Sequence, residues 1–235
     1  MREPLSEELL PQLLEHFREQ MSNLTAAIQL ITPVVRERGE SRYDQYLAVM
    51  NQSIYRMLRT LRNAEFAQLP EGEEPLREAS LDLAGLCREI AAQAAPLAKQ
   101  AGVQFSYEEE TGALLTTGDA ALLRRMLFQL ISNALRAAEQ EGQAGLRLCR
   151  TRDRAVLAVW DSGPGLDREE TGGGLLKRSE GLGLGLLVAR RIAGLHGGAL
   201  VLEQREDRGV RAVVSLPIRP PKSTGILSTP KMGYD

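Results

Sequence analysis

The chain has 235 residues, 43% of them hydrophobic and 4% aromatic, which is enough for one sizeable hydrophobic core or two smaller ones. A formal net charge of -2 gives no support to nucleic-acid or anionic-membrane binding as the main role. The N-terminus MREPLSEELLPQ lacks a signal-peptide core, and no window reaches the roughly 20 apolar residues of a membrane span. Cys87 and Cys149 fit neither a disulfide framework nor a zinc site, so we expect a soluble, cytoplasmic protein.

Residues 1–69 carry a heptad pattern that predicts two long helices. Their apolar positions alternate at spacings of four and three residues, the seam of a coiled coil or bundle. Gly39 suits a helix stop, and Ser41 or Glu40 suits a restart. The seam residues are Leu10, Leu14, Phe17, Met21, Leu24, Ile28, Ile31 and Val35, then Tyr43, Leu47, Met50, Ile54, Met57, Leu61 and Ala64.

Two such helices joined by a short turn form an antiparallel hairpin, which buries little apolar surface alone. We therefore predict that two copies pack as a four-helix bundle and that the protein is a homodimer. The alternative is a hairpin that packs on the second domain of its own chain, since the same period suits intramolecular packing.

The composition changes at QLPEGEEPLRE, where two prolines, a glycine and several acids indicate a linker. We place the linker at residues 70–79, a second domain at 80–219 and a disordered tail at 220–235. The second domain is expected to be mixed α+β, with its strands in one layer and its helices in the other.

Three helices and six strands are expected in this domain. One helix is predicted from an N-cap at Ser80 to Gly102, bent or broken at Pro96, and another from Asp119 to Gly142. A further helical pattern, LLVARRIAGL, follows a glycine-rich stretch. The expected strands are VQFSYEE, ALLTTG, GLRLCRT, AVLAVWD, ALVLEQ and VRAVVSLPI.

Polar residues share one face of the second of these helices. In FQLISNALRAA, Gln129 and Asn133 lie four residues apart, and Arg136 lies on the adjoining edge. Amides in this position indicate a polar ligand. The alternative is that Asn133 faces solvent or caps a neighbouring loop.

Two glycine-containing segments follow. In VWDSGPGL, Asp161 ends a strand beside Gly163 and Gly165, so its carboxylate could accept a hydrogen bond from an amine such as that of adenine; the alternative is a tight turn. In EGLGLGLLVARRIAGLHGG, three glycines precede a helix, which favours phosphate binding; the alternative is a flexible hinge. These three glycines are Gly181, Gly183 and Gly185.

The order of these segments resembles that of the histidine-kinase-type ATPases, the superfamily that also holds gyrase, Hsp90 and MutL. GDAALLRRMLFQLISNALRAA is similar to the N box, DSGPG to the G1 box and GLGLGLL to the G2 box. GLHGGALVLEQREDRGVRAVVSLP is similar to the end of a histidine kinase catalytic domain. The resemblance implies a sensor histidine kinase core: a dimerisation hairpin, then a two-layer α/β sandwich that binds ATP.

The resemblance also implies a role for each site residue. Asn133 would hold Mg2+ bridged to the ATP phosphates, with Arg136 on the phosphate side. Asp161 would bind the adenine amine, while Gly163 and Gly165 would line the nucleotide. The glycines that would shape the return of a mobile lid over the phosphates are Gly181, Gly183 and Gly185.

The lid segment departs from the family pattern. The family usually has a longer lid with phenylalanine, whereas LDREETGGGLLKRSE, which follows Gly165, is short and has none, so looser closure is expected. Lys177 or Arg178 is a candidate phosphate donor; the alternative is an exposed, solubilising role. Gln129 stands where the family often has another asparagine.

The phosphoacceptor position departs as well. The best match to the family's first helix is REQMSNLTA, which places Arg18 at the histidine and Glu19 at the following acid. His16 is the only histidine in the hairpin, but it lies two residues before Arg18 and therefore points about 200° around the helix from it. His16 is either a displaced phosphoacceptor or an ordinary solvated histidine. His196, at a helix end before two glycines, is expected to be structural.

Three functions follow from this pattern. The first is a histidine-kinase-like protein of bacterial two-component signalling, which binds Mg-ATP, phosphorylates a histidine and passes the phosphate to a response regulator. The second is a degenerate histidine kinase that lacks the acceptor and acts as an ATP-binding dimeric scaffold or response-regulator phosphatase. The third is an anti-sigma-type serine kinase, against which the hairpin argues.

Overall fold

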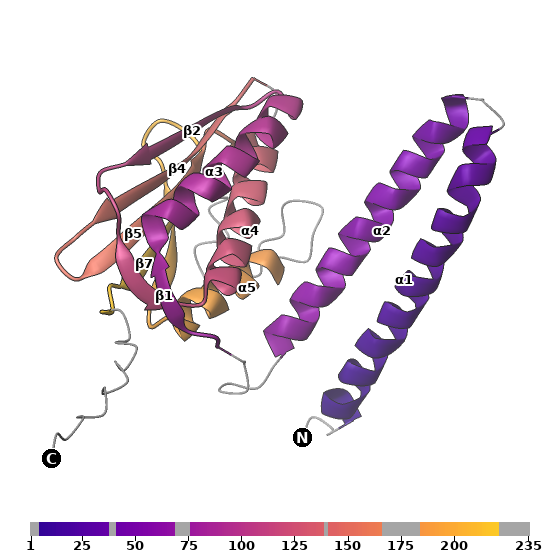
Figure 1. Cartoon of the computed structure of the whole chain (residues 1–235), viewed down its shortest axis with the longest axis horizontal. Helices are drawn as coiled ribbons and strands as arrows, with labels where there is room; N and C mark the ends of the chain where they lie inside the picture. Colours follow the sequence, from indigo (N-terminus) through magenta and orange to yellow (C-terminus); the bar gives the residue numbers. More distant parts are fainter. Residues whose placement is uncertain (1–4, 38–40, 69–75, 139–140, 166–183, 221–235) are drawn as a thin grey trace, which may run out of the picture. The chain divides into compact units, whose positions relative to one another are not determined.

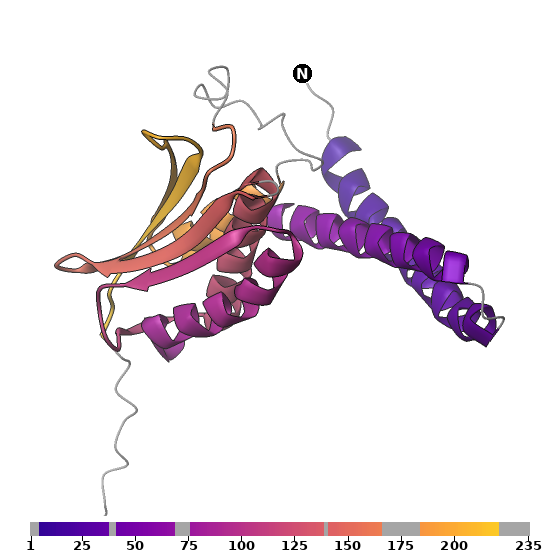
Figure 2. The same cartoon turned by 90° about the horizontal axis from the view of Figure 1, so that it is seen from above.

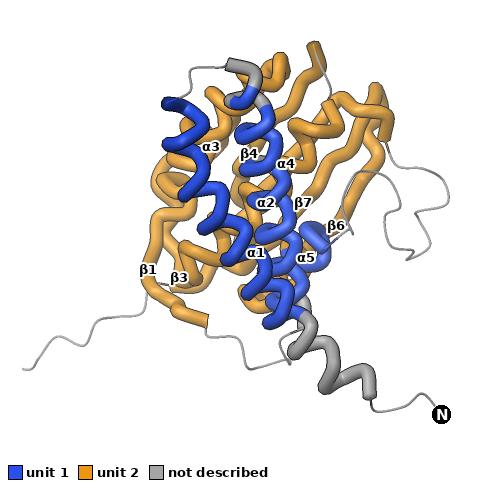
Figure 3. The backbone as a smooth tube through the Cα atoms, turned by 90° about the vertical axis from the view of Figure 1, so that its right-hand side faces the viewer, with its two compact units in different colours: residues 1–74, 172–188 blue, residues 75–171, 189–235 orange. Residues whose placement is uncertain are grey.

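The structure of the chain is a computed structural model, which divides into two compact units, described separately below (Figure 3). No helix among the described residues is both long and apolar enough to cross a membrane. The units comprise residues 1–74 with 172–188 and residues 75–171 with 189–235. The described residues are 5–37, 41–68, 76–138, 141–165 and 184–220.

The first unit contains a helical hairpin made of α1 (Leu5–Glu37) and α2 (Ser41–Gln68) (Figure 1). The predicted restart at Ser41 is confirmed. One half of each predicted seam faces the other helix, because residues seven apart return to the same side of a helix. The buried seam residues are Met21, Ile28, Leu47, Ile54 and Leu61.

The other half of each seam is exposed in the hairpin. These side chains also recur every seven residues, so they form a second apolar stripe beside the buried one. Such a stripe is wider than the scattered apolar residues of an ordinary protein surface. The exposed seam residues, with the fraction of each that is accessible, are Phe17 (55%), Leu24 (47%), Ile31 (51%), Met50 (47%) and Met57 (44%).

The elements that follow the hairpin alternate between strands and helices. They are β1 (Ala79–Asp82), α3 (Leu83–Gln100), β2 (Gln104–Glu109), β3 (Leu115–Gly118), α4 (Ala120–Ala138), β4 (Gln143–Arg150), β5 (Arg154–Asp161), α5 (Leu184–Leu195), β6 (Ala199–Gln204) and β7 (Val210–Pro217).

A five-stranded sheet forms one layer, in the order β2-β4-β5-β7-β6. The pair β2 and β4 is parallel, and the other three pairs are antiparallel. Helices α3 and α4 cover one face of this sheet, as Figure 2 shows. The predicted arrangement of strands in one layer and helices in the other is therefore confirmed. Strands β1 and β3 pair separately as a two-stranded sheet.

The core of this domain lies between the sheet and its helices. Along the central strand β5, Ala155, Leu157 and Val159 are buried and alternate with half-buried residues, because successive side chains point to opposite faces. From α4, Leu127 and Ile131 lie four residues apart and are also buried. The apolar residues that recur with the strand period in β5 and with the helix period in α4 thus belong to one hydrophobic layer.

The prediction for the start of the first helix in this domain was wrong. Ser80 lies within β1 rather than at an N-cap, because residues 79–82 satisfy their backbone by pairing with β3. Asp82 is the N-cap of α3, and its Oδ1 accepts hydrogen bonds from Ala84 N at 3.1 Å and Leu114 N at 2.9 Å. These bonds hold the pKa of the Asp82 carboxyl below its ordinary value of 3.8.

Pro96 lies inside α3 and does not break it, so of the two predicted effects, a bend or a break, the break was wrong. Pro96 lies on the exposed side of the helix, so the carbonyl that loses its N–H partner is near solvent. The helix ends at Gln100, and Gly102 follows with a φ of 72°, as its place in the sequence predicted. Gly142 does not supply a left-handed turn at the next helix end, since Glu141 does so with a φ of 64°.

Asp82→Ala should lower the free energy of unfolding of the α/β domain by about 1–2 kcal/mol, because two backbone N–H groups lose their acceptor. Asp82→Asn should cost less. The difference in the free energy of unfolding between wild type and Asp82→Asn should be present at pH values above the ordinary pKa of 3.8. It should disappear as the pH falls through the lowered pKa of Asp82. Denaturant unfolding followed by the single tryptophan, Trp160, measures both effects.

Asp153→Ala is the matched control, since Asp153 is exposed in the turn between β4 and β5. Its stability should stay within about 0.5 kcal/mol of wild type. Equal losses in Asp82→Ala and Asp153→Ala would contradict the capping role.

Candidate functional site

Helix α4 begins at a cap that fixes its position against the end of α5. The Asp119 carboxylate accepts hydrogen bonds from Ala121 N at 2.9 Å, Leu122 N at 3.0 Å and Arg77 N at 2.9 Å. Its own N–H donates to His196 Nε2 at 3.0 Å. Burial alone would raise the pKa of Asp119, but these backbone donors and His196 hold it below the ordinary value.

His196 is buried, and its Nδ1 lies 2.8 Å from the backbone oxygen of Ile192. Both ring nitrogens therefore have backbone partners. Gly197 follows with a φ of 71°. The structural role predicted for His196 agrees with these contacts.

The predicted polar face lies along α4. Gln129 and Asn133 are both half-buried, and Arg136 is exposed one turn further on. Arg136 Nη2 donates a hydrogen bond to Asn133 Oδ1 at 2.5 Å. The amide oxygen of Asn133 is thus already in contact with a positively charged group, the guanidinium of Arg136. Among the residues that the structure describes, no cluster of three or more His, Cys, Asp or Glu side chains could hold a metal ion.

Asp161 ends β5, the central strand of the sheet, and is buried. Its Oδ1 accepts hydrogen bonds from Gly163 N at 2.9 Å and Val210 N at 3.3 Å. None of the described residues donates a hydrogen bond to Oδ2. Burial raises the pKa of the Asp161 carboxyl, and the two backbone donors and Arg205 offset this only in part.

Glycines allow close contacts on both sides of this carboxylate. A Cβ at Gly163 would lie 2.4 Å from the backbone oxygen of Ala137, so the last turn of α4 reaches the segment after β5 only because residue 163 is glycine. Gly165 has a φ of 94°, and a Cβ there would lie 2.5 Å from Gln204 Nε2. The first two predicted segments therefore meet, with Asn133 one turn before Ala137 on α4.

Sequence reasoning missed the turn between β6 and β7, residues 205–209. Arg205 Nη1 donates to the backbone oxygen of Asp161 at 2.8 Å, and Arg208 Nε donates to that of Gly163 at 3.2 Å. The letters REDRG between two strands indicate only a polar turn. Their position beside Asp161 follows from the pairing of β5 with β7, which one sequence does not reveal.

The third predicted segment is described only in part. Gly185 lies inside α5, which begins at Leu184, so the prediction that all three glycines precede the helix was wrong for this residue. Gly185 is the second residue of α5. The first four N–H groups of a helix have no partner within the helix, so the backbone N–H of Gly185 can still donate to a ligand. The residues outside the described part of this segment are Lys177, Arg178, Gly181 and Gly183.

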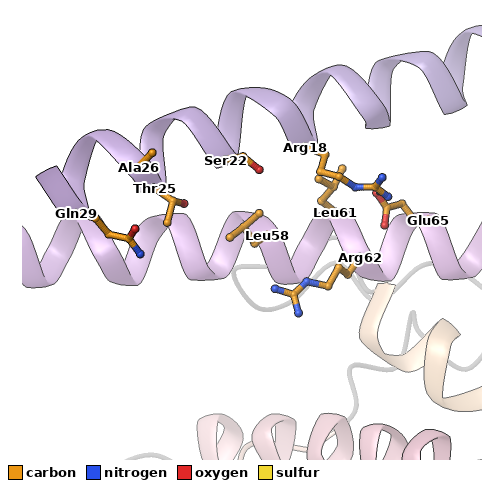
Figure 4. Close-up of a pocket in the computed structure, with 9 residues that line it drawn as sticks. All are labelled: Arg18, Ser22, Thr25, Ala26, Gln29, Leu58, Leu61, Arg62 and Glu65. Carbon is orange, nitrogen blue, oxygen red and sulfur yellow. The ribbon is translucent and has the colours of Figure 1, made fainter.

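The candidate acceptor positions lie on α1. Arg18 donates to Glu15 Oε2 from Nη1 and to Glu65 Oε1 from Nη2, each at 2.6 Å, so it connects α1 to α2. Arg18 and Glu65 line a groove of about 590 Å³ between the two helices, where Figure 4 shows their side chains pointing toward each other. His16 is exposed and does not line this groove.

A family model covers most of the α/β domain. Residues 118–220 match the family described as Histidine kinase-, DNA gyrase B-, and HSP90-like ATPase. The matched range includes α4 and the strand end at Asp161, so the described part of the candidate site that follows the hairpin lies within it.

A curated relative matches both parts of the chain. The alginate biosynthesis sensor protein KinB of Pseudomonas aeruginosa is 26% identical over 204 residues, which are 81% of this chain and 34% of KinB. The chain thus spans about a third of the length of this relative.

Solved structures have the same fold. The nucleotide-free catalytic domain of histidine kinase ThkA covers 61% of this chain and 99% of its own length, with 26% identity and a TM-score of 0.56. ThkA in complex with the response regulator protein TrrA covers 91% of this chain and 63% of its own, at 19% identity and a TM-score of 0.64.

Full-length ShkA in complex with AMPPNP has a TM-score of 0.73 at 22% identity, over 92% of this chain and 47% of ShkA. This match extends through the hairpin as well as the α/β domain and shows the shared fold. Together, these similarities show that residues 118–220 form a histidine kinase-, DNA gyrase B- and HSP90-like ATPase domain and that the chain is similar to the core of sensor histidine kinases.

Proposed function

We propose that this chain is an ATP-binding histidine-kinase-like protein of bacterial two-component signalling. The observation that carries the proposal is the buried carboxylate of Asp161, whose Oδ1 is held by two backbone N–H groups while no described residue donates to Oδ2. An adenine amine is a suitable donor for that oxygen, since a hydrogen bond to a desolvated carboxylate is strong. Gly163 and Gly165 would line the base.

Mg2+ would be held by Asn133 Oδ1, with the ATP phosphates as its other ligands. Mg2+ usually takes only one or two protein oxygens together with phosphates and water, so one amide oxygen fits this ion better than a larger carboxylate cluster would. When bound, the ion would neutralise charge on the phosphates. Arg136 would then turn from Asn133 to a phosphate, and Gln129 would supply a second amide on the same face.

The remaining glycines would surround the phosphates. Gly185 keeps an N–H at the start of α5, which favours an anion there. Gly181 and Gly183 would shape the return of the lid, as the resemblance implies. The structures of ShkA with AMPPNP and ThkA with TrrA support nucleotide and response-regulator binding as properties to test in this chain.

The expected reaction is transfer of the ATP γ-phosphoryl group to a histidine and then to a response regulator. His16 is the candidate acceptor, because an arginine at position 18 has no nucleophilic lone pair to offer. His16 is exposed, so a phosphate could reach it.

A degenerate kinase is the second candidate function, and the contacts of Arg18 favour it. Its guanidinium occupies the expected acceptor position and is tied to acids on both helices at 2.6 Å. In that case the chain acts as an ATP-binding dimeric scaffold or a response-regulator phosphatase. No described contact favours an anti-sigma-type serine kinase.

The chain would be organised as a hairpin over residues 1–69, a linker at 70–79, an ATP-binding domain at 80–219 and a tail at 220–235. The exposed stripe of α1 and α2 supports dimerisation through the hairpin. A cytoplasmic location is consistent with two cysteines that are both free, Cys87 and Cys149.

Incubation with Mg2+ and γ-labelled ATP distinguishes the two functions. A kinase that uses His16 gives acid-labile label in wild type and none in His16→Ala. A degenerate kinase binds ATP without taking label, and Arg18→His should then acquire acid-labile label, because Glu19 already stands at the position of the acid that follows the family's histidine. A wild type that binds no ATP would contradict both functions.

Asp161→Asn should weaken ATP binding by tenfold or more, since an amide offers the amine a neutral acceptor in place of a charged one. The variant should nevertheless unfold at the same or a higher temperature than wild type at pH 7. The raised pKa means that wild-type stability falls as the pH rises through the pKa of Asp161, and the neutral amide avoids this loss. ATP titration tests the first effect and thermal unfolding tests the second. An unchanged ATP affinity would contradict adenine binding by Asp161 and would mean that DSGPG forms only a tight turn.

Leu24→Glu should convert a dimer to a monomer at micromolar concentration, because it places a charge in the exposed seam stripe. Light scattering measures the change. Leu30→Glu is the control: Leu30 is 77% exposed and lies about 200° around the helix from the buried Ile28, so the dimer should persist. A monomeric wild type would contradict the four-helix bundle.

A further inference from the structure

The turn between β6 and β7, with the first residue of β7, holds the end of β5, and the proposed function gives the two arginines of this turn no role. Arg205 Nη1 donates to the backbone oxygen of Asp161 at 2.8 Å. Arg208 Nε donates to the backbone oxygen of Gly163 at 3.2 Å, and Val210 N donates to Asp161 Oδ1 at 3.3 Å. Donors from one short stretch of chain thus fix both the main chain and the carboxylate of the residue that would bind adenine.

Arg205 is itself held in one position. Its guanidinium carbon lies 4.5 Å from the centre of the Trp160 ring, which is a cation–π contact. Its backbone N–H donates to the oxygen of Gly209 at 3.0 Å and closes the turn. Gly209 has a φ of 95°, and a Cβ there would lie 2.0 Å from the backbone oxygen of Asp161, so only glycine lets the turn approach this closely.

We propose that Arg205 is a positioning residue that sets the selectivity of the site for adenine, with Arg208 in a supporting role. This inference rests on the proposed function, in which Asp161 accepts a hydrogen bond from the adenine amine. With its main-chain oxygen bound by Arg205 and its Oδ1 bound by two N–H groups, the carboxylate has one orientation, and Oδ2 is the oxygen left for the base.

A loss of orientation has a different signature from a loss of positive charge. The charge of Arg205 would attract the phosphates of every nucleotide equally, so its removal would weaken all nucleotides alike. The orientation of Asp161 matters only for a base that carries the amine. Hypoxanthine has an oxygen in place of that amine and an N–H at N1, so the ratio of ITP to ATP dissociation constants reports recognition of the adenine edge and not attraction of the phosphates. Arg205→Lys keeps the positive charge and therefore separates the orientation of Asp161 from the effect of that charge on its carboxylate.

The test measures ATP and ITP dissociation constants for the full chain at fixed Mg2+. Wild type should prefer ATP by about tenfold or more, as expected for one charged hydrogen bond. Arg205→Gln should reduce this preference at least threefold with little change in ITP affinity, and Arg208→Gln should reduce it less. Arg211→Gln, which removes an exposed arginine of β7 next to Glu203, should leave the preference unchanged.

An unchanged preference in Arg205→Gln, or equal weakening of ATP and ITP, would overturn the inference while ATP binding by wild type upholds the proposed function. Wild type that binds ATP and ITP equally would show that Asp161 does not read the amine, which also overturns it. If Arg205→Gln does not fold, Arg205→Lys decides: it keeps the charge but lacks the planar fork, so the preference should still fall.

Discussion

Burial of the Asp161 carboxylate is the constraint on which the rest of the candidate site depends. An ionised group removed from water costs free energy unless hydrogen bonds replace the lost hydration. Here the backbone N–H groups of Gly163 and Val210 donate to one oxygen, and Gly209 lets the turn before β7 approach Asp161 closely. The raised pKa shows that this compensation is incomplete, which is the condition in which a ligand donor stabilises the carboxylate most.

The hairpin has two apolar stripes, although one would be enough for α1 to pack against α2. The buried stripe joins the helices, and the exposed stripe needs a partner. Arg18 adds a polar contact between α1 and α2 through Glu65, at the position that the resemblance assigns to the phosphoacceptor. The two halves of the chain thus differ: the α/β domain matches an ATPase family, whereas the hairpin has an ion pair where the resemblance predicts a nucleophile.

Periodicity predicted most of the elements, since the heptads of the hairpin and the alternation of β5 reflect faces that the fold buries. It failed where a distant strand decides the local structure: pairing with β3 turns Ser80 into a strand residue and moves the cap to Asp82. The same reason explains why Asp161 could be identified and Arg205 could not. A motif is local, whereas the contact of Arg205 with Asp161 arises only when β6, β7 and β5 lie together in the sheet.

Binding of the adenine base by Asp161 can be tested by measuring the pKa of this carboxyl group, with and without nucleotide, from the NMR signal of its carboxyl carbon. Without nucleotide the pKa should lie above the ordinary value of 3.8, because the carboxylate is buried. ADP should lower it, since the adenine amine donates to the ionised form, and IDP should not. A pKa that is unaffected by ADP, or that falls equally with ADP and IDP, would contradict the claim that this carboxylate binds the adenine base.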